Sequence, residues 1–303
     1  MPSADLTPPE LRLLLAVDQA GTFTAAARRL GLTQSAVSYA VTTCERKLGV
    51  VLFERGRAGA RPTPAGRRVL VHAGHILRQL EQMRADAQGA ATGTTGGPLA
   101  IAAFRSVALH LLPAALERLT ARHPGLSPHV MIVPELGAGT AGEVAEGRAD
   151  LAIATLGDDA DPPPGLLADT LLIEPYLLVY PAGHPSSRNL PLIDWPENCS
   201  SYTREWWSRQ DWLPPATLQV ADDGVVLSMV AQGLGMAILP RLTLTAPPAG
   251  VTAVPLGERP PTRRIVHVTT AATRQSLAVR DLVRELRKVA APLGVPRPVS
   301  LTE

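Results

Sequence analysis

Five side chains with hydrogen-bonding groups lie close together near residue 40 of this 303-residue chain. Gln34, Ser35, Ser38, Tyr39 and Thr42 are spaced so that the outer side of one helix would carry them, and none is charged. A helix face that meets only water usually carries Glu and Lys. Short hydroxyls and an amide can instead bond to base edges in a major groove, where Gln pairs with adenine and Ser or Thr with either strand. The pattern predicts a base-reading face, with a solvated Ser/Thr-rich face as the alternative.

Three helices are predicted to position that face. The first runs from about Pro8 to Ala20, and the second starts after Thr22 or Thr24, whose hydroxyl would cap its first turn, and ends at residue 30. The third takes Thr33 as its N-cap and runs to about residue 48. A glycine, which readily ends a helix, follows each of them: Gly21, Gly31 and Gly49.

Only Gly31, Leu32 and Thr33 connect the second helix to the third. A turn of this length that contains glycine is typical of a helix-turn-helix. The inner side of the third helix is then expected to pack on the first two helices. Helical spacing assigns these residues to the core: Val37, Val41, Cys44 and Leu48, facing Leu11, Leu14, Phe23 and Leu30.

The run from about Leu6 to Leu70 resembles the winged helix-turn-helix of LysR-type transcriptional regulators. The matching landmarks, in order, are the alanine-rich second helix, TQSAVS, LG followed by LFER, and R-PTPAG. The resemblance implies a DNA-binding domain over residues 6–63, in which Thr33 and the outer face of the third helix contact DNA. It also implies a wing after Phe53, with Arg55 and Arg61 near the phosphates. The flexible basic loop RGRAGAR would supply salt-sensitive affinity without sequence preference.

A further helix is predicted over residues 64–90. Its apolar residues recur at steps of four and three, which is typical of the seam of a two-stranded coiled coil: Val69, Ala73, Ile76, Leu80, Met83 and Ala87. A second copy of the chain could cover this stripe, and we assign dimerisation to Val69, Ile76, Leu80 and Met83. Packing on the helix's own domain would produce the same stripe.

Charge and cysteine content indicate the class of partner and the cellular compartment of the protein. Residues 1–90 hold twelve basic and seven acidic residues and the remainder seventeen and twenty, balances of +5 and −3 that sum to the net +2. This asymmetry favours an anionic polymer as partner of the first part. Cys44 and Cys199 form no disulfide framework and fit a reducing cytosol. With neither a signal-peptide pattern nor a long apolar run, the protein is expected in the cytoplasm.

Beyond residue 97, short apolar runs alternate with helical patterns, which predicts an α/β unit with mostly parallel strands. Two segments mark boundaries. Gln88–Pro98 is rich in Gly and Thr and indicates a flexible hinge over 91–97, whereas Asp158–Gly165 is a proline-stiffened crossing.

This second part resembles the effector-binding domain of the same regulators, which is similar to type 2 periplasmic solute-binding proteins. GGPLAIAAF, LLPAALERLTARHPG, VAEGRADLAIA, GHP and VLSMVAQGLGMAILPR carry the likeness. The resemblance implies two α/β lobes, one made of 98–160 and 266–295 and the other of 163–265, with a small-molecule effector in the cleft between them. Tyr202 and Thr203 match the region that supplies effector contacts in the family.

Strand-to-helix turns indicate further effector contacts. Arg105 and Ser106 follow the first strand and begin a helix, so backbone N–H groups and one cation would face the cleft. Gly137 and Thr140 belong to a second turn of this kind. These groups favour an acidic or polar effector over an apolar one.

The alternative function is that of an NAD-dependent oxidoreductase. GAGTAG (Gly137–Gly142) matches G-x-G-x-x-G and follows the strand HVMIV. However, the motif stands on a second strand, PEL intervenes, and Gly147 cuts the next helix short. Catalytic and metal-binding patterns such as G-x-S-x-G, H-E-x-x-H and cysteine clusters are missing from the sequence, so we expect neither an enzyme nor a cofactor.

We therefore expect a transcriptional regulator of the LysR type that forms dimers or tetramers on double-stranded DNA, with RNA polymerase as a further candidate partner. The four tryptophans, which lie between residues 195 and 212, leave two interpretations open. They could line an aromatic or oligomer-forming surface, or form a local core cluster under a long loop, which we favour.

Overall fold

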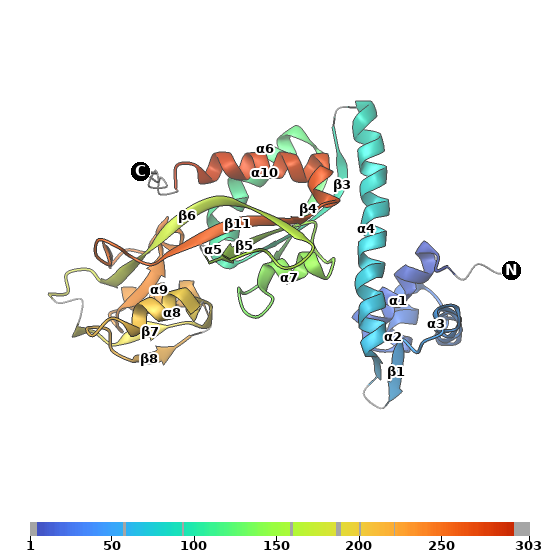
Figure 1. Cartoon of the computed structure of the whole chain (residues 1–303), viewed down its shortest axis with the longest axis horizontal. Coiled ribbons are helices and arrows are strands. Elements are labelled where there is room, and N and C mark those ends of the chain that lie inside the picture. Colours follow the sequence, from blue (N-terminus) through green and yellow to red (C-terminus); the bar gives the residue numbers. More distant parts are fainter. Residues whose placement is uncertain are drawn as a thin grey trace, which may run out of the picture. The chain divides into compact units, whose positions relative to one another are not determined.

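The computed structural model describes residues 5–56, 59–92, 94–157, 160–185, 189–199, 201–220 and 222–293. The chain divides into two compact units, one of residues 1–91 with 146–148 and the other of residues 92–145 and 149–303. Figure 1 labels the helices and strands of both units. Among the helices in these ranges, none combines the length and the apolar composition needed to cross a bilayer.

Three helices open the first unit at the predicted places: α1 (Pro8–Ala20), α2 (Phe23–Leu30) and α3 (Gln34–Leu48). The Thr22 hydroxyl, rather than that of Thr24, caps α2 by accepting the Ala25 N–H at 3.1 Å. The Thr33 hydroxyl caps α3 by accepting the Ala36 N–H at 3.2 Å. Each hydroxyl satisfies an N–H of the first turn, for which the helix itself offers no carbonyl.

The inner face of α3 forms the core of this unit. Val37, Val41 and Cys44 are fully buried and pack with Leu14 of α1, as their helical spacing predicts. The expected burial of Leu48 is wrong, because 37% of its surface is exposed. Leu48 is the last residue of α3, and the chain leaves the helix directly after it.

The expected wing after Phe53 is a β-hairpin whose strands take in residues 55, 56 and 59–61 of the segment expected as a flexible loop; residues 57 and 58 lie outside the described residues. Strands β1 (Phe53–Gly56) and β2 (Gly59–Pro62) pair antiparallel. The Ala60 N–H donates to the Gly21 carbonyl at 2.7 Å, which ties the hairpin to the end of α1. Gly59 has a φ of 97°, and a Cβ there would collide with that same carbonyl oxygen. Only glycine fits this close approach.

Helix α4 (Pro64–Thr92) begins directly after the hairpin. Leu11 of α1 packs against its Ala73 and Leu77, so Leu11 contacts α4 rather than α3. Helix α4 takes in residues 91 and 92 of the hinge expected over 91–97, and the next strand takes in residues 96 and 97, which pair with Gly125 and Leu126.

The second unit is built on a main sheet of seven strands, counted over the described residues, in the order β10–β6–β11–β5–β3–β4, with β9 also beside β6. Its strands are β3 (Gly96–Ala103), β4 (Gly125–Ile132), β5 (Leu151–Leu156), β6 (Leu166–Pro181), β9 (Ala237–Pro240), β10 (Val251–Pro255) and β11 (Thr262–Thr270). Among these, β3 pairs in parallel with β4 and β5, whereas β9, β10 and β11 pair antiparallel with β6. The expectation of mostly parallel strands therefore holds for one part of the sheet only.

Strand β6 runs through both lobes of this unit. Its residues 166–175 pair with β11, and residues 176–181 pair with β9 and β10. The pairing therefore changes between Pro175 and Tyr176, whereas the expected lobe boundary at residue 163 precedes the whole strand. A continuous strand shows no break in its sequence pattern, so only the pairing locates this crossing. A smaller parallel pair, β7 (Leu192–Asp194) and β8 (Ala216–Gln219), lies in the second lobe.

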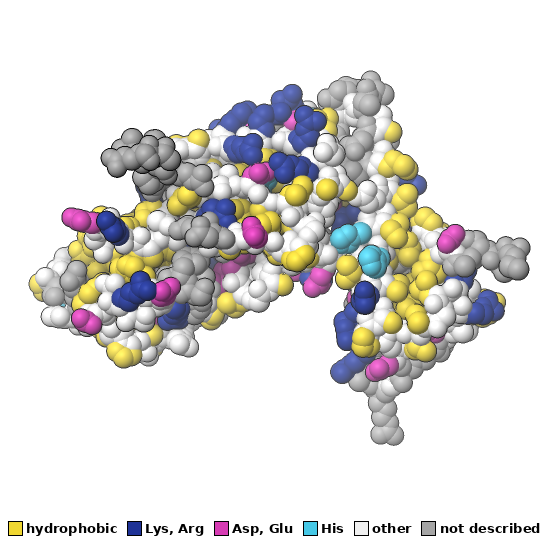
Figure 2. All heavy atoms as spheres, in the orientation of Figure 1, with side chains coloured by type: hydrophobic (Ala, Val, Ile, Leu, Met, Phe, Trp, Pro, Cys, Tyr) yellow, Lys and Arg dark blue, Asp and Glu magenta, His cyan; other side chains and the backbone are white. Residues whose placement is uncertain are grey.

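Helices cover both faces of the first lobe (Figure 1). Ile101 of β3 packs with α5, α6 and α10, and Ala102, which points to the other face, packs with α7. Figure 2 shows Lys and Arg side chains gathered over α6 and α10. The helices of this unit are α5 (Arg105–His110), α6 (Leu112–Arg122), α7 (Gly139–Ala145), α8 (Ser201–Ser208), α9 (Asp223–Ala231) and α10 (Leu277–Ala290), with 3-10 turns at Pro196–Cys199, Arg241–Leu244 and Thr273–Gln275.

Candidate nucleic-acid interface and ligand pocket

The outer face of α3 is open to solvent. Gln34, Ser35, Tyr39 and Thr42 are exposed, and Ser38 is half-buried. Tyr39 exposes 71% of its surface, which is a high value for an aromatic residue. The structure thus places the five predicted base-reading residues on one uncharged, accessible side of the helix.

Local hydrogen bonds already engage some of these hydroxyls. Thr33 Oγ1 caps the helix and lies 3.1 Å from Ser35 Oγ, and Thr42 Oγ1 donates to the Ser38 carbonyl at 3.0 Å. The Gln34 amide has no hydrogen-bond partner among the described residues, so its donor and acceptor remain available to a ligand. Thr33 therefore acts first as a helix cap, and Gln34 has the greatest capacity to read a base.

The wing offers an exposed basic residue in the same unit. Arg61 is exposed on β2, where it lies opposite Glu54 of β1. The Arg55 side chain lies outside the described residues, although its backbone belongs to β1.

The apolar stripe of α4 divides into two groups. Val69 and Leu80 are half-buried and pack with the core residues of their own unit. Ile76 and Met83 expose 47% and 60% of their surfaces. Of the four residues assigned to dimerisation, the latter two are thus the more accessible to a second chain.

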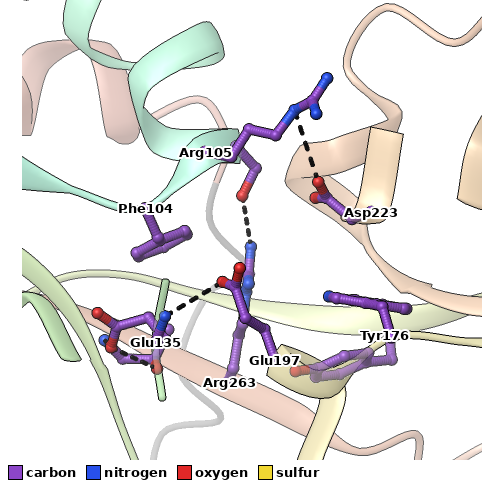
Figure 3. A pocket seen from close by; sticks show the side chains of 10 residues that line it. Phe104, Arg105, Glu135, Tyr176, Glu197, Asp223 and Arg263 are labelled. Atoms are coloured by element: carbon purple, nitrogen blue, oxygen red, sulfur yellow. Dashed lines mark hydrogen bonds and ion pairs between the residues drawn. The ribbon is translucent and has the colours of Figure 1, made fainter. Parts of the chain in front are cut away.

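A polar pocket lies in the second unit where its two lobes meet (Figure 3). It takes residues from strand ends, helix starts and the long strands β6 and β11. Its lining residues are Phe104, Arg105, Ser106, Glu135, Thr155, Tyr176, Trp195, Glu197, Asp223 and Arg263.

Arg105, expected to present a cation to the cleft, forms ion pairs across the pocket. Its guanidinium contacts Asp222, and its Nε lies 3.8 Å from Asp223 Oδ1. The hydrogen bond to Asp222 raises the pKa of Arg105 above its usual value. Gly224 permits this approach, because a Cβ there would collide with the guanidinium.

Arg263 is the second cation of the pocket, and it is also paired. Its Nε donates to Glu174 Oε1 at 2.7 Å, and its Nη2 donates to Ser106 Oγ at 3.1 Å. The guanidinium carbon lies 4.9 Å from the centre of the Phe104 ring. Ser106 is therefore occupied by Arg263, and it lies only 3% exposed at the pocket wall.

Three carboxylates also line the pocket, and their partners differ. Glu135 accepts from the Thr155 N–H and hydroxyl at 2.9 and 3.0 Å and from the Thr140 N–H at 2.9 Å. Asp223 accepts from a threonine hydroxyl at 2.7 Å. Glu197 accepts only the Glu135 N–H, at 3.3 Å, among the bonds of the described residues. Burial raises the pKa of Glu197, against the lowering effect of the hydrogen bond from the Glu135 N–H and of the Arg263 charge, and the negative charge of Asp223 adds to the rise.

The structure places two of the six predicted effector residues, Arg105 and Ser106, in the pocket wall. Thr140 is fully buried and its hydroxyl donates to a strand carbonyl, Thr203 is fully buried, and neither Thr203 nor Gly137 belongs to the lining. The Tyr202 side chain lies outside the described residues.

Sequence reasoning missed the remaining wall residues. The PEL segment and the tryptophan-rich segment, both already singled out, could have indicated Glu135, Trp195 and Glu197. The sequence pattern gave no indication of the wall residues on the long strands β6 and β11, which are Tyr176 and Arg263. Trp207 packs in one core cluster with Trp206 and Trp212 beside it, and Trp195 packs in another, which supports the core interpretation for all four tryptophans.

The turn that matches G-x-G-x-x-G does not present an open anion site. Glu135, two residues before the first glycine of the motif, already accepts the Thr140 N–H at the start of α7. A pyrophosphate at this helix start would therefore meet a carboxylate. Helix α7 ends at Ala145, too early to run along the sheet.

Comparison with known proteins agrees with this arrangement. Residues 9–67 match the bacterial regulatory helix-turn-helix family of the lysR type, and residues 92–291 match the LysR substrate binding domain. The probable HTH-type transcriptional regulator LrrA of Synechococcus elongatus is 37% identical over 257 residues, which cover 80% of this chain and 84% of LrrA.

Solved structures show the same fold. A full-length OxyR of Pseudomonas aeruginosa aligns with a TM-score of 0.71 and 24% identity, covering 95% of this chain and 97% of OxyR. Full-length CbnR, solved in complex with its target DNA, aligns with a TM-score of 0.67 and 20% identity, covering 94% of this chain and all of CbnR. These curated relatives are transcriptional regulators rather than oxidoreductases, so they give the NAD-dependent alternative no support. The chain therefore belongs to the LysR family of DNA-binding transcriptional regulators, with an N-terminal helix-turn-helix and a C-terminal effector-binding domain.

Proposed function

We propose that this regulator reads its operator with the outer face of α3 and that a small molecule in the pocket between the two lobes controls it. The exposed, uncharged face around Gln34 carries the first part of the proposal. Ser35, Ser38, Tyr39 and Thr42 would add contacts to bases and phosphates, and Thr33 would hold the start of the helix against the DNA. Arg55 and Arg61 of the wing would bind phosphates.

The second part rests on the position of the pocket. Its walls come from both lobes, and the chain crosses between them within β6, next to Tyr176. A ligand that contacts both walls favours one arrangement of the lobes over the other. In a dimer or tetramer joined through Ile76 and Met83, such a shift would change the spacing at which two DNA half-sites are held.

We further propose that the protein has no catalytic role and acts in the cytoplasm, where the DNA lies. Among the hydroxyls of the pocket, that of Ser106 is the best candidate for a nucleophile. It accepts a hydrogen bond from Arg263 and has no general base beside it among the described contacts. Its arrangement therefore supports binding rather than group transfer.

A footprint on the promoter region of the protein's own gene tests the proposal. The full-length protein is expected to protect a defined site against an excess of scrambled duplex. Gln34→Ala should lose that preference, and the exposed Arg259→Ala serves as control because its loop lies in the second unit. Equal binding of the wild type to promoter and scrambled duplex would refute the assignment of α3.

A further inference from the structure

We infer that the effector carries a cationic group, an ammonium or a guanidinium, which binds at Glu197. The inference rests on the proposed function, because it assumes that the effector occupies the pocket between the lobes. The sequence favoured an acidic or polar effector through Arg105 and the helix start beside it, and a cationic group keeps the polar alternative and excludes the acidic one.

The charge balance of the pocket is the first argument. Its two guanidinium groups are already matched, Arg105 by Asp222 and Asp223, and Arg263 by Glu174. An acidic ligand would have to displace one of these carboxylates, and it would leave that carboxylate unpaired near other negative charges.

Glu197 is the second argument. No Lys, Arg or His of the described residues lies within ion-pair distance of its carboxylate, and the following residues 198–202, NCSSY, contain no basic side chain. Glu135 and Asp223 line the same space and repel its charge, whereas Arg263, which is ion-paired with Glu174, attracts it from beyond ion-pair distance. Figure 3 shows the Glu197 carboxylate in the middle of the pocket, next to the Glu135 backbone. A ligand cation would supply the missing counter-charge.

The aromatic wall is the third argument. Tyr176 and Trp195 line the pocket and are 3% and 4% exposed, so packing holds both rings in place. The faces of such rings attract cations, and the attraction grows where water is excluded. Carboxylate and aromatic walls together favour an organic cation over a metal ion, which would take oxygen ligands alone.

Small ligands of similar shape but different charge test whether the pocket recognises the charge of its ligand. We would measure thermal unfolding of the full-length protein with butylguanidinium, with its uncharged isostere butylurea, with butylammonium and with butyrate, at equal ionic strength. The two cations are expected to raise the Tm, and butylurea and butyrate are not. Glu197→Gln should weaken cation binding by about tenfold or more. Glu258→Gln, at an exposed glutamate of the same unit, should leave it unchanged.

A cation built into the protein as a side chain tests the inference without depending on the affinity of a probe. Glu197→Lys places an ammonium in the pocket, and this variant is expected to unfold at a higher temperature than Glu197→Gln and to alter the promoter footprint without added ligand. A lower Tm of Glu197→Lys than of Glu197→Gln would overturn the inference, whether or not the probes bind.

The same measurements distinguish a wrong cationic assignment from a pocket that binds no effector. If butyrate or butylurea stabilises the protein and shifts the footprint equally in the wild type and in Glu197→Gln, the pocket binds an effector but the cationic assignment is wrong. If no probe alters Tm or footprint and Glu197→Lys behaves as the wild type in both, the effector role of the pocket is refuted together with the inference.

Discussion

Arg263 and Glu174 face each other across the paired strands β11 and β6, and Arg263 Nε donates to Glu174 Oε1 at 2.7 Å. Both side chains are at least nine-tenths buried. The pair lies one residue before the point where β6 leaves β11 and enters the second lobe. The second Glu174 oxygen accepts the Leu242 N–H of that lobe. The Arg263–Glu174 ion pair therefore links the point where β6 crosses between the lobes to the wall of the pocket, which Arg263 lines.

Removing one partner of the Arg263–Glu174 ion pair should destabilise the second unit. Arg263→Met is expected to lower the free energy of unfolding of the second unit by about 3–5 kcal/mol, because it leaves Glu174 buried without its counter-charge. Urea denaturation followed by circular dichroism measures the change. Arg263→Met combined with Glu174→Gln should recover part of the loss. A double variant as unstable as the single one would show that the charge left behind is not the cause.

Two variants should separate base reading from phosphate binding. Gln34→Ala is expected to reduce discrimination between operator and mutated operator by about 1–3 kcal/mol, because the amide contacts a base edge. Arg61→Ala should weaken binding to all duplexes alike and reduce the slope of log K against log salt by about one. Binding titrations at several salt concentrations measure both quantities. An equal loss of discrimination in the two variants would contradict these roles.

His267 should make stability depend on pH below neutrality. Burial lowers its pKa from 6.5 to about 4, against the opposing effect of Asp169, and the side chain is 6% exposed. Above pH 6.5 the imidazole is neutral in both states. Between pH 6.5 and 4 the unfolded chain takes up a proton that the folded protein does not, so the free energy of unfolding falls by on the order of 3 kcal/mol.

The difference between the wild type and His267→Gln isolates this contribution, because other groups titrate in both proteins. Their stability difference is expected to vary between pH 6.5 and 4 and to be constant above pH 7. A difference that stays constant over the whole range would show that His267 titrates normally.

The exposed residues of α4 should control self-association. Replacing Ile76 and Met83 with glutamate is expected to raise the dissociation constant of the dimer at least about tenfold, because charges would be buried at the proposed seam. Sedimentation velocity at several concentrations measures it. Glu81→Gln, on the exposed surface of the same helix, is the control. Unchanged assembly in the Ile76/Met83 variant would place the interface elsewhere.

Cys44 should be chemically inert in the folded protein. It is fully buried, and burial raises the pKa of its thiol to about 11. Because the thiolate is the reactive form, alkylation by iodoacetamide at pH 8 is expected to be at least about a hundredfold slower in buffer than in urea. Mass spectrometry of the peptide that contains Cys44 measures the rate. Rapid labelling of the native protein would argue against a purely structural thiol.

The helix-turn-helix could be predicted from the sequence because its signals are local. Threonine caps, glycine stops and helical spacing each act within a few residues, and they located α1, α2 and α3 correctly. The wing differs, because its short strands depend on a contact with the Gly21 carbonyl, which lies far from them in sequence. Leu11 and Leu48 were placed wrongly for a similar reason, since spacing identifies a helix face but not the neighbour that covers it.

The sequence by itself determined the helices, their polar and apolar faces and the family, because each of these follows from the order of residues along one segment. Only the tertiary structure decided the pocket. Its walls combine residues from Phe104 to Arg263, and the pairing of Arg105 with Asp222 and of Arg263 with Glu174 left the pocket carboxylates of Glu197 and Glu135 without an ion-pair partner among the described residues. Electrostatic matching depends on distances in space, which residue spacing does not encode.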